Sequence, residues 1–416
     1  MRRAPVLTCA LVVSVLATGG VAVAAPVRTV GPATAVVLDV AHEADTGRAL
    51  VVWSRGDGAR TERLELLRED ASGRLRRVRQ LAATRPRDSD EFPFGAAQVA
   101  TTPAGDPVAA WNERAVLRGF AGGRTATLDP DTQFEDHAFD LAADPDGTAV
   151  VAFPGPAGLS VAERAPGAPF AAISAVSRAN GGVAQAATDG RGGAVVALAD
   201  TFGRVTAAIR EPGGSFGRAQ TLRREGRPAR SLALALAPTG RAVAAWGYGS
   251  ADGGSVEAAE RPAGAPAFAA RRTLTPPDLL ADAETATAVA ERDGTVTVAW
   301  QEVIPGPNRA QALRWAPGAR PGAPRRVFSR GPDQDDVRAL LTDAGRVKVV
   351  FRTSVGRNGG RYLAVDPLGA RRPTVLTPPN VISEPAFAAG PRGLLTVWNR
   401  GFNEESGPVL LTRTGL

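Results

Sequence analysis

Acidic side chains are the residues of this sequence best suited to chemistry, and they recur just before one type of apolar segment. They are Asp90 and Glu91, Glu135 and Asp136, Asp282 and Glu284, Asp335 and Asp336, and Glu384. Clustered carboxylates raise one another's pKa, which suits acid–base chemistry, and they attract cations. Acids are also common in solvated loops, and this simpler interpretation is favoured. A ligand site follows only if the fold gathers these segments.

Two further residues are candidates for binding. His137 follows Glu135 and Asp136, so these side chains could ligate a metal ion or share a proton, although a solvated loop is the favoured alternative. Tyr248 stands two residues after Trp246, and we expect it to be an aromatic residue at the rim of the site. One cysteine and two histidines exclude a Cys-based zinc site and a His-rich centre. We therefore assign no catalytic residue and no cofactor, and we leave a cation at the acidic segments open.

The elements that would position these residues come from an internal repeat. A glycine turn is followed by a run of β-forming residues that ends in a large apolar residue, which we call the anchor. The eight anchors are Trp53, Trp111, Phe153, Leu198, Trp246, Trp300, Phe351 and Trp398. Neighbouring anchors are 42 residues (111 to 153) to 58 residues (53 to 111) apart. A period of this size is typical of the blades of a β-propeller.

Each period is long enough for four short strands. In the fifth period we expect strands over residues 231–237, 243–246, 256–260 and 270–274, separated by turns rich in Gly and Pro. The small residues of the first strand suit the crowded axis, and the anchor suits the wider interface between blades. The sequence thus predicts an all-β propeller of eight four-stranded blades, with seven blades as the alternative.

The two ends of the chain complete the pattern. The last period stops after a third strand (residues 409–413), and residues 27–30 resemble a fourth strand placed before the first inner strand, 35–40. The ring is therefore predicted to close with the N-terminal strand, which would remove exposed sheet edges. In this ring the acidic segments would lie around the mouth of the central channel.

These repeats resemble those of secreted bacterial β-propeller proteins, and the resemblance covers residues 25–416. It points to no specific named family. The anchor tryptophans are not followed by Asp as in WD40 repeats, and Ser250 to Gly254 match only half of a sialidase Asp-box, with Glu257 where the Trp should be. In sialidase-like propellers a Tyr–Glu pair acts as nucleophile. No arginine triad is recognisable in this sequence, so we do not assign the nucleophile role to Tyr248.

Residues 1–24 have the features of a secretory signal peptide. Arg2 and Arg3 precede an apolar run from Val6 to Leu16, and small residues follow up to Ala24. We expect cleavage after Ala24, a single propeller domain over residues 25–416, and a secreted, extracellular protein. The apolar run is too short for a retained anchor, and no other segment is long and apolar enough to span a membrane. Cys9 would leave with the leader.

Charge adds little about the ligand. The net charge of +7 falls to +5 without Arg2 and Arg3, and 48 of the 49 basic residues are arginine (49 minus Lys348). The arginines are scattered among acids and form no stripe with aromatic residues, so we predict no nucleic-acid partner. We expect a monomeric, non-catalytic scaffold that binds an envelope glycan or a secreted protein. The alternative is a carbohydrate-active hydrolase or lyase, sialidase-like or other, with Glu135, Asp136, Asp282 and Glu284 as candidate acids.

Overall fold

A computed structural model describes most of residues 27–416. The residues left out within this range are 44, 57–60, 87–92, 103–104, 132–138, 157, 172, 179–180, 225, 250–253, 276–281, 305–306, 329–332, 355–359, 368–372, 380, 382–383, 400–407 and 416. For residues 282–284 only the backbone is described. Across the described residues the chain forms β-strands and no helix. It follows that no helix in this part is suited to crossing a membrane.

The strands form eight four-stranded antiparallel sheets, numbered here as blades one to eight. Blades one to four contain β2 (Ala35–His42), β3 (Ala49–Gly56), β4 (Glu62–Glu69), β5 (Leu75–Thr84); β6 (Phe94–Thr101), β7 (Pro107–Glu113), β8 (Val116–Ala121), β9 (Arg124–Asp129); β10 (Asp140–Ala143), β11 (Ala149–Gly155), β12 (Gly158–Arg164), β13 (Ser174–Ala175); and β14 (Val183–Thr188), β15 (Ala194–Ala199), β16 (Val205–Arg210), β17 (Gln220–Arg223). Blades five to eight contain β18 (Ala229–Leu236), β19 (Ala242–Tyr248), β20 (Ser255–Arg261), β21 (Arg272–Thr273); β22 (Asp282–Ala290), β23 (Val296–Val303), β24 (Arg309–Trp315), β25 (Arg325–Arg326); β26 (Gln334–Leu341), β27 (Val347–Ser354), β28 (Gly360–Val365), β29 (Thr374–Val375); and β30 (Ala386–Gly390), β31 (Gly393–Asn399), β32 (Val409–Thr414) with β1 (Arg28–Gly31).

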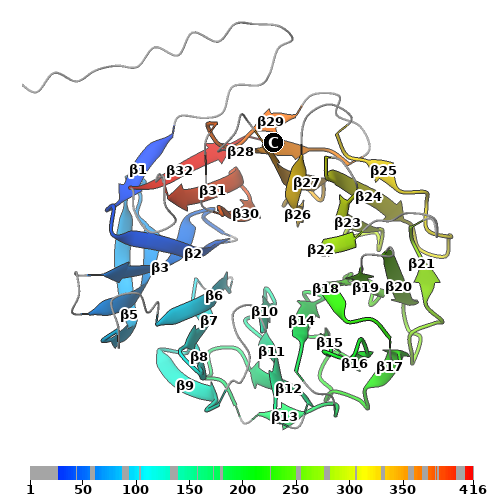
Figure 1. Ribbon diagram of the computed structural model, residues 1–416. Helices are drawn as coiled ribbons and strands as arrows, with labels where there is room; N and C mark the ends of the chain where they lie inside the picture. Colours follow the sequence, from blue (N-terminus) through cyan, green and yellow to red (C-terminus); the bar gives the residue numbers. More distant parts are fainter. Residues whose placement is uncertain are drawn as a thin grey trace, which may run out of the picture.

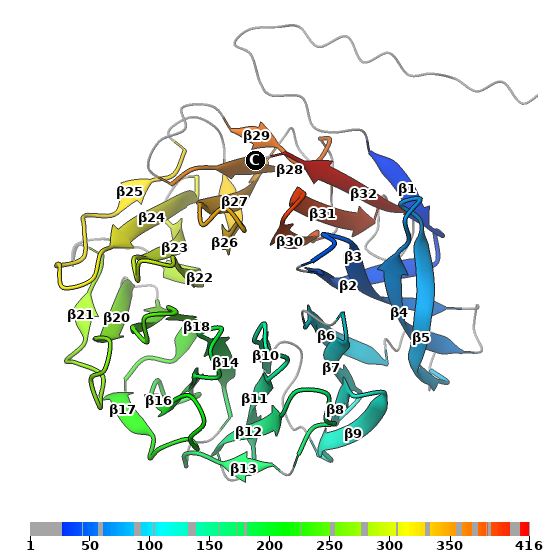
Figure 2. The ribbon, with the colours of Figure 1, turned by 180° about the vertical axis from the view of Figure 1, so that it is seen from behind.

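The blades are arranged as a closed ring with the first strand of each blade innermost (Figures 1 and 2). Inner strand β2 contacts both β6 and β30, so the first blade lies between the second and the eighth. The predicted propeller of eight blades is confirmed, and the alternative of seven is wrong. Strand direction alternates within each blade. Consequently the loops between blades and the loops between second and third strands share one face of the ring, the loop face; the other is the turn face.

The repeated glycine and the anchor have separate roles. All eight repeat glycines have positive φ, from 61° at Gly47 to 97° at Gly393, a region that other residues rarely adopt. Each turn from a first to a second strand therefore depends on its glycine. The eight anchors are all buried, and each belongs to a different apolar cluster.

Each of these clusters joins two neighbouring blades. The cluster of Trp246, for example, combines Val195 and Ala207 of blade four with Leu232 and Ala242 of blade five. The anchors therefore fill the interfaces between blades, as their size predicts. Burial of this apolar surface is the main force that holds one blade against the next.

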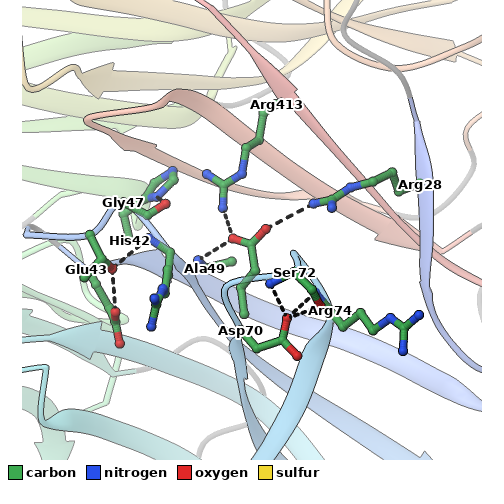
Figure 3. A network of polar contacts seen from close by, with 12 residues as sticks. Arg28, His42, Glu43, Gly47, Ala49, Asp70, Ser72, Arg74 and Arg413 are labelled. Carbon is green, nitrogen blue, oxygen red and sulfur yellow. Dashed lines mark hydrogen bonds and ion pairs between the residues drawn. The ribbon is translucent and has the colours of Figure 1, made fainter.

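The ring closes where the two ends of the chain meet. Strand β1 pairs antiparallel with β32, so the N-terminal strand is the outermost strand of the last blade, as predicted. Glu69, at the end of β4 in the first blade, accepts hydrogen bonds from Arg28 of β1 (3.1 Å), from the Ala49 N–H (3.1 Å) and from Arg413 of β32 (Figure 3). We call this the Glu69 network. Its contacts connect the first blade to both strands at the seam.

Ionic pairs between blades also occur elsewhere and use buried arginines near the ends of third strands. Arg210 pairs with Glu163 of the preceding blade, and Arg261 pairs with Glu211 of the preceding blade. Both arginine side chains are less than a tenth exposed. Part of the arginine excess therefore stabilises the interfaces between blades and is not available to a ligand.

Candidate ligand site at the centre of the loop face

Polar side chains occur at one repeated position of several inner strands. This position pairs with the residue just before the anchor, as in Asp39 with Val52, Gln98 with Ala110, Asp140 with Ala152, Thr287 with Ala299 and Arg338 with Val350. An inner strand is the edge of its sheet, so some of its N–H groups have no partner within the blade. A polar side chain from the preceding blade can satisfy them.

Four of these side chains accept a hydrogen bond from the inner strand of the next blade. Asp39 accepts from the Val99 N–H at 2.7 Å, and Gln98 accepts from the Leu141 N–H at 2.6 Å. The same contact links Asp140 to the Ala186 N–H at 2.9 Å and Thr287 to the Ala339 N–H at 3.2 Å. In each case, the residue whose N–H donates comes directly after the repeated polar position in the inner strand of its own blade. The repeated polar position thus connects neighbouring blades around the axis.

A cavity of about 370 Å³ lies where the inner strands of blades seven, eight, one and two approach one another on the loop face. We call it the mouth cavity. Its polar lining comes from Asp39, Gln98, Arg338 and Glu384, and its apolar lining includes Val37, Phe94 and Pro385. Hydrogen-bond donors and acceptors from four blades therefore face one space. Its size is within the range of small-ligand sites.

Arg338 organises one side of the mouth cavity. Its Nε lies 3.0 Å from an Asp336 carboxylate oxygen, and its Nη2 lies 3.5 Å from a Glu384 carboxylate oxygen. The guanidinium also stands over the Phe387 ring, 5.8 Å from the centroid. Asp336 has a positive φ of 45°, a strained backbone conformation for a non-glycine residue. Two of the predicted acids, Asp336 and Glu384, thus converge on one arginine that the sequence did not reveal as a site residue.

The neighbouring groups are also paired. Asp335 lies 3.9 Å from Arg352, and burial raises the pKa of this carboxyl group. Tyr362 is buried, and burial together with the nearby Asp336 charge raises the pKa of its hydroxyl group. Arg338 and Arg352 therefore offset part of the negative charge that the loop acids bring to this side of the mouth.

Asp39 has an unusual environment for a carboxylate. Burial raises its pKa from 3.8 to about 7, although the hydrogen bond from Val99 and the charge of Arg338 oppose this shift. Burial also raises the pKa of Asp140, which occupies the equivalent position two blades on. Asp39 therefore titrates near neutral pH while it lines the mouth cavity.

Changing Asp39 to Asn should stabilise the protein at pH 8 by about 2 kcal/mol and by less than about 0.5 kcal/mol at pH 4. Because the folded pKa of about 7 exceeds the ordinary 3.8, the folded protein holds this proton more tightly than the unfolded chain does. The stability contributed by Asp39 is complete below pH 3.8 and is lost as pH rises through 7. Asparagine keeps an oxygen for the Val99 N–H without the charge. Urea unfolding of both proteins between pH 4 and 8 measures the difference; parallel pH profiles would contradict this assignment.

The other predicted residues do not all join the cavity. Tyr248 is half-buried in blade five, with the Arg223 guanidinium 4.3 Å from its ring centroid, and it does not line the mouth cavity. Asp282 and Glu284 lie in β22, but their side chains are outside the described part. Glu91, Glu135, Asp136 and His137 are outside the described residues. Among the residues that the structure describes, no group of three or more His, Cys, Asp or Glu side chains could hold a metal ion.

Comparison with known proteins establishes the fold and no family. No family model matches the chain, and no curated protein matches it in sequence. Among solved structures, the BP39L lectin from Burkholderia pseudomallei is 12% identical, with a TM-score of 0.51 over 84% of this chain and 100% of the lectin. The PL25 ulvan lyase, a polysaccharide lyase, is 8% identical, with a TM-score of 0.51 over 93% and 96%.

A third similar structure is a prolyl endopeptidase, 14% identical, with a TM-score of 0.51 over 88% of this chain. The match spans only 55% of that enzyme, so this chain corresponds to about half of its length. At these identities the three likenesses show the β-propeller fold alone. The names of the three proteins differ in activity, so the shared fold does not indicate a function for this chain.

Proposed function

We propose that this protein is a secreted, non-catalytic β-propeller that binds a saccharide of the cell envelope in the mouth cavity. The carrying observation is that Asp39, Gln98, Arg338 and Glu384, from four different blades, line one space of about 370 Å³. Convergent polar groups in a partly apolar cavity are the usual form of a small-ligand site.

The mixture of groups favours a hydroxyl-rich, uncharged ligand. Carboxylate and amide oxygens accept from hydroxyl groups, while the guanidinium and amide N–H groups donate to them. Arg338 already lies beside Asp336 and Glu384, so the cavity has no dominant charge of one sign. Other proteins of this fold include a lectin and a polysaccharide lyase. A secreted protein partner is the competing type of ligand.

Replacing Glu384 with Ala should weaken saccharide binding at least tenfold, because the change removes a carboxylate from the mouth cavity. The side chain is 75% exposed, so its loss should not disturb folding. The measurement is an array of neutral envelope oligosaccharides probed with the protein, followed by titration calorimetry on any that bind. Asp343→Asn, at an exposed position on the turn face, is the matched control and should bind like the unmodified protein.

Two results would contradict the proposal. Failure to bind any oligosaccharide would remove its basis, and capture of a secreted protein instead would favour the competing ligand. Equal binding by the Glu384→Ala variant and the control would place the ligand elsewhere. N-terminal sequencing of protein recovered from the medium tests secretion separately and should begin at Ala25.

One observation favours the enzymatic alternative. Asp39 and Glu384 are two carboxylates of the same cavity, and the pKa of Asp39 is about 7, as general acid catalysis requires. As a hydrolase or lyase, the protein would release shorter products from the oligosaccharides that it binds, and Asp39→Asn would abolish this release. We favour the binding role because the hydrogen bond of Asp39 to Val99 repeats at Gln98, Asp140 and Thr287, which is expected of a structural contact.

A further inference from the structure

On the turn face, one buried arginine of the described chain lacks the acidic partner that its equivalents have. Arg164, Arg210 and Arg261 occupy the same position in blades three, four and five, because each pairs in register with the second residue after the repeat glycine. Arg210 and Arg261 form ion pairs with acids of the preceding blade. Arg164 is 1% exposed, and neither its Nη1 nor its Nη2 has a hydrogen-bond partner among the described residues. Its guanidinium is therefore a buried positive charge with two unused nitrogen atoms.

The preceding blade supplies no acid at the point where the equivalent arginines find one. Those acids lie at the turn-face end of the third strand of the preceding blade. In blade two this strand, β8, ends at Ala121 and is followed by Gly122 and Gly123. A Cβ atom at Gly122 would lie 2.9 Å from the carbonyl oxygen of Gly167 in blade three, and φ at Gly122 is 56°. Blade two thus approaches blade three with its backbone here and offers no carboxylate.

The acids close to Arg164 are engaged elsewhere or lie at the surface. Glu163, the preceding residue, is paired with Arg210. Asp106 of blade two is exposed. Burial lowers the pKa of the Arg164 guanidinium, and the charge of Asp106 only opposes this shift. Nε of Arg164 donates to the Ala165 carbonyl at 3.3 Å, a contact that brings no negative charge. Because an arginine stays protonated in proteins, its charge still requires a counterion.

We propose that Arg164 binds a chloride ion at the interface between blades two and three, through the N–H groups of Nη1 and Nη2. A buried charge without a partner is strongly destabilising. A water molecule would accept hydrogen bonds from the two nitrogen atoms but would not balance the charge. Chloride is close to water in size, which suits a side chain with almost no exposed surface. The ion would join these two blades as Glu163 and Glu211 join the next ones.

The first test is urea unfolding of the full chain as chloride rises from about 5 to about 500 mM, with sodium gluconate keeping the ionic strength constant. Chloride should lower the equilibrium constant of unfolding about tenfold over this range, because it binds the folded state. Arg164→Met should abolish this dependence. The matched control is Arg210→Met, which removes an equally placed arginine that already has Glu163 as its partner, and it should keep the dependence.

A second measurement needs no variant. Crystals of the unmodified protein soaked in sodium bromide should give an anomalous bromide peak beside the Nη atoms of Arg164. No such peak would overturn the proposal, and so would an equal chloride dependence in the Arg164→Met variant and the unmodified protein. A sulfate effect that exceeds the chloride effect and disappears in Arg164→Met would overturn the choice of ion.

Asp106→Asn separates a bound chloride from an internal ion pair. With chloride as the counterion, this variant should depend on chloride at least as strongly as the unmodified protein does, because a competing negative charge is removed. A chloride dependence that appears only in Asp106→Asn would show that Asp106 itself turns inward to pair with Arg164, and the proposal would be wrong. The site lies on the turn face, so none of these results depends on saccharide binding in the mouth cavity.

Discussion

Truncating Trp246 to alanine should lower the free energy of unfolding by about 4 kcal/mol. Its side chain is fully buried and fills the interface between blades four and five, against Val195 and Leu232. Alanine would leave a cavity that the strands on both sides cannot close. The indole N–H also donates to Glu257 at 3.0 Å, so the substitution removes a partner of a buried carboxylate. Urea unfolding followed by far-UV circular dichroism measures the loss.

The control for this prediction is another aromatic residue of the same region. Phe202 is 60% exposed and should change the free energy of unfolding by less than about 0.5 kcal/mol when truncated to alanine. Equal losses for the two variants would show that the anchors do not carry the interfaces between blades. Leu198 is the anchor of blade four and has a smaller side chain, so Leu198→Ala should give an intermediate loss of about 3 kcal/mol.

Replacing Glu69 with alanine should cost about 3 kcal/mol, because it removes the acceptor shared by three donors at the ring seam. Burial alone would raise the pKa of Glu69, but the Ala49 hydrogen bond and the Arg413 charge hold that pKa below its ordinary value. Without the carboxylate, Arg413 keeps a partly buried positive charge with no other ion-pair partner among the described residues. The seam should then open at lower urea concentration than the other interfaces.

Two variants sharpen this test. Glu69→Gln keeps one acceptor oxygen and should lose less than half as much stability as the alanine variant. Glu384→Ala removes an exposed acid that also faces an arginine, and its loss should be below about 0.5 kcal/mol. Hydrogen exchange of the backbone amides of β1 and β32 measures the local stability of the seam. Unchanged exchange there in the Glu69→Ala variant would contradict the role of the Glu69 network.

The architecture could be predicted because every blade has the same physical requirements, and the residues that meet them recur in the sequence. Each blade needs a glycine with positive φ at the same turn and a large apolar residue at the same interface, so the eight copies reinforce one another. The closing strand was predictable because the last blade lacks a fourth strand in sequence order. The ends of an outer strand differ: the sequence predicts a strand over residues 270–274, and only Arg272–Thr273 form one.

The site was harder to predict because it depends on groups brought together from distant blades. Asp39, Gln98 and Arg338 stand within inner strands, where they read as polar interruptions and not as loop acids. The usable signal is that they occupy the same position relative to the anchor in different repeats.

The most direct test of saccharide binding in the mouth cavity is to block the cavity and measure the binding that remains. Cys9 is the only cysteine and lies in the predicted leader, so Glu384→Cys or Asp343→Cys would give the mature chain a single thiol. Each variant is reacted with a maleimide carrying a bulky polyethylene glycol, and its binding to the oligosaccharide identified on the array is measured. Modification at position 384 should abolish binding, and modification at position 343, on the opposite face, should leave it unchanged. Full binding after modification at position 384 would contradict saccharide binding in the mouth cavity.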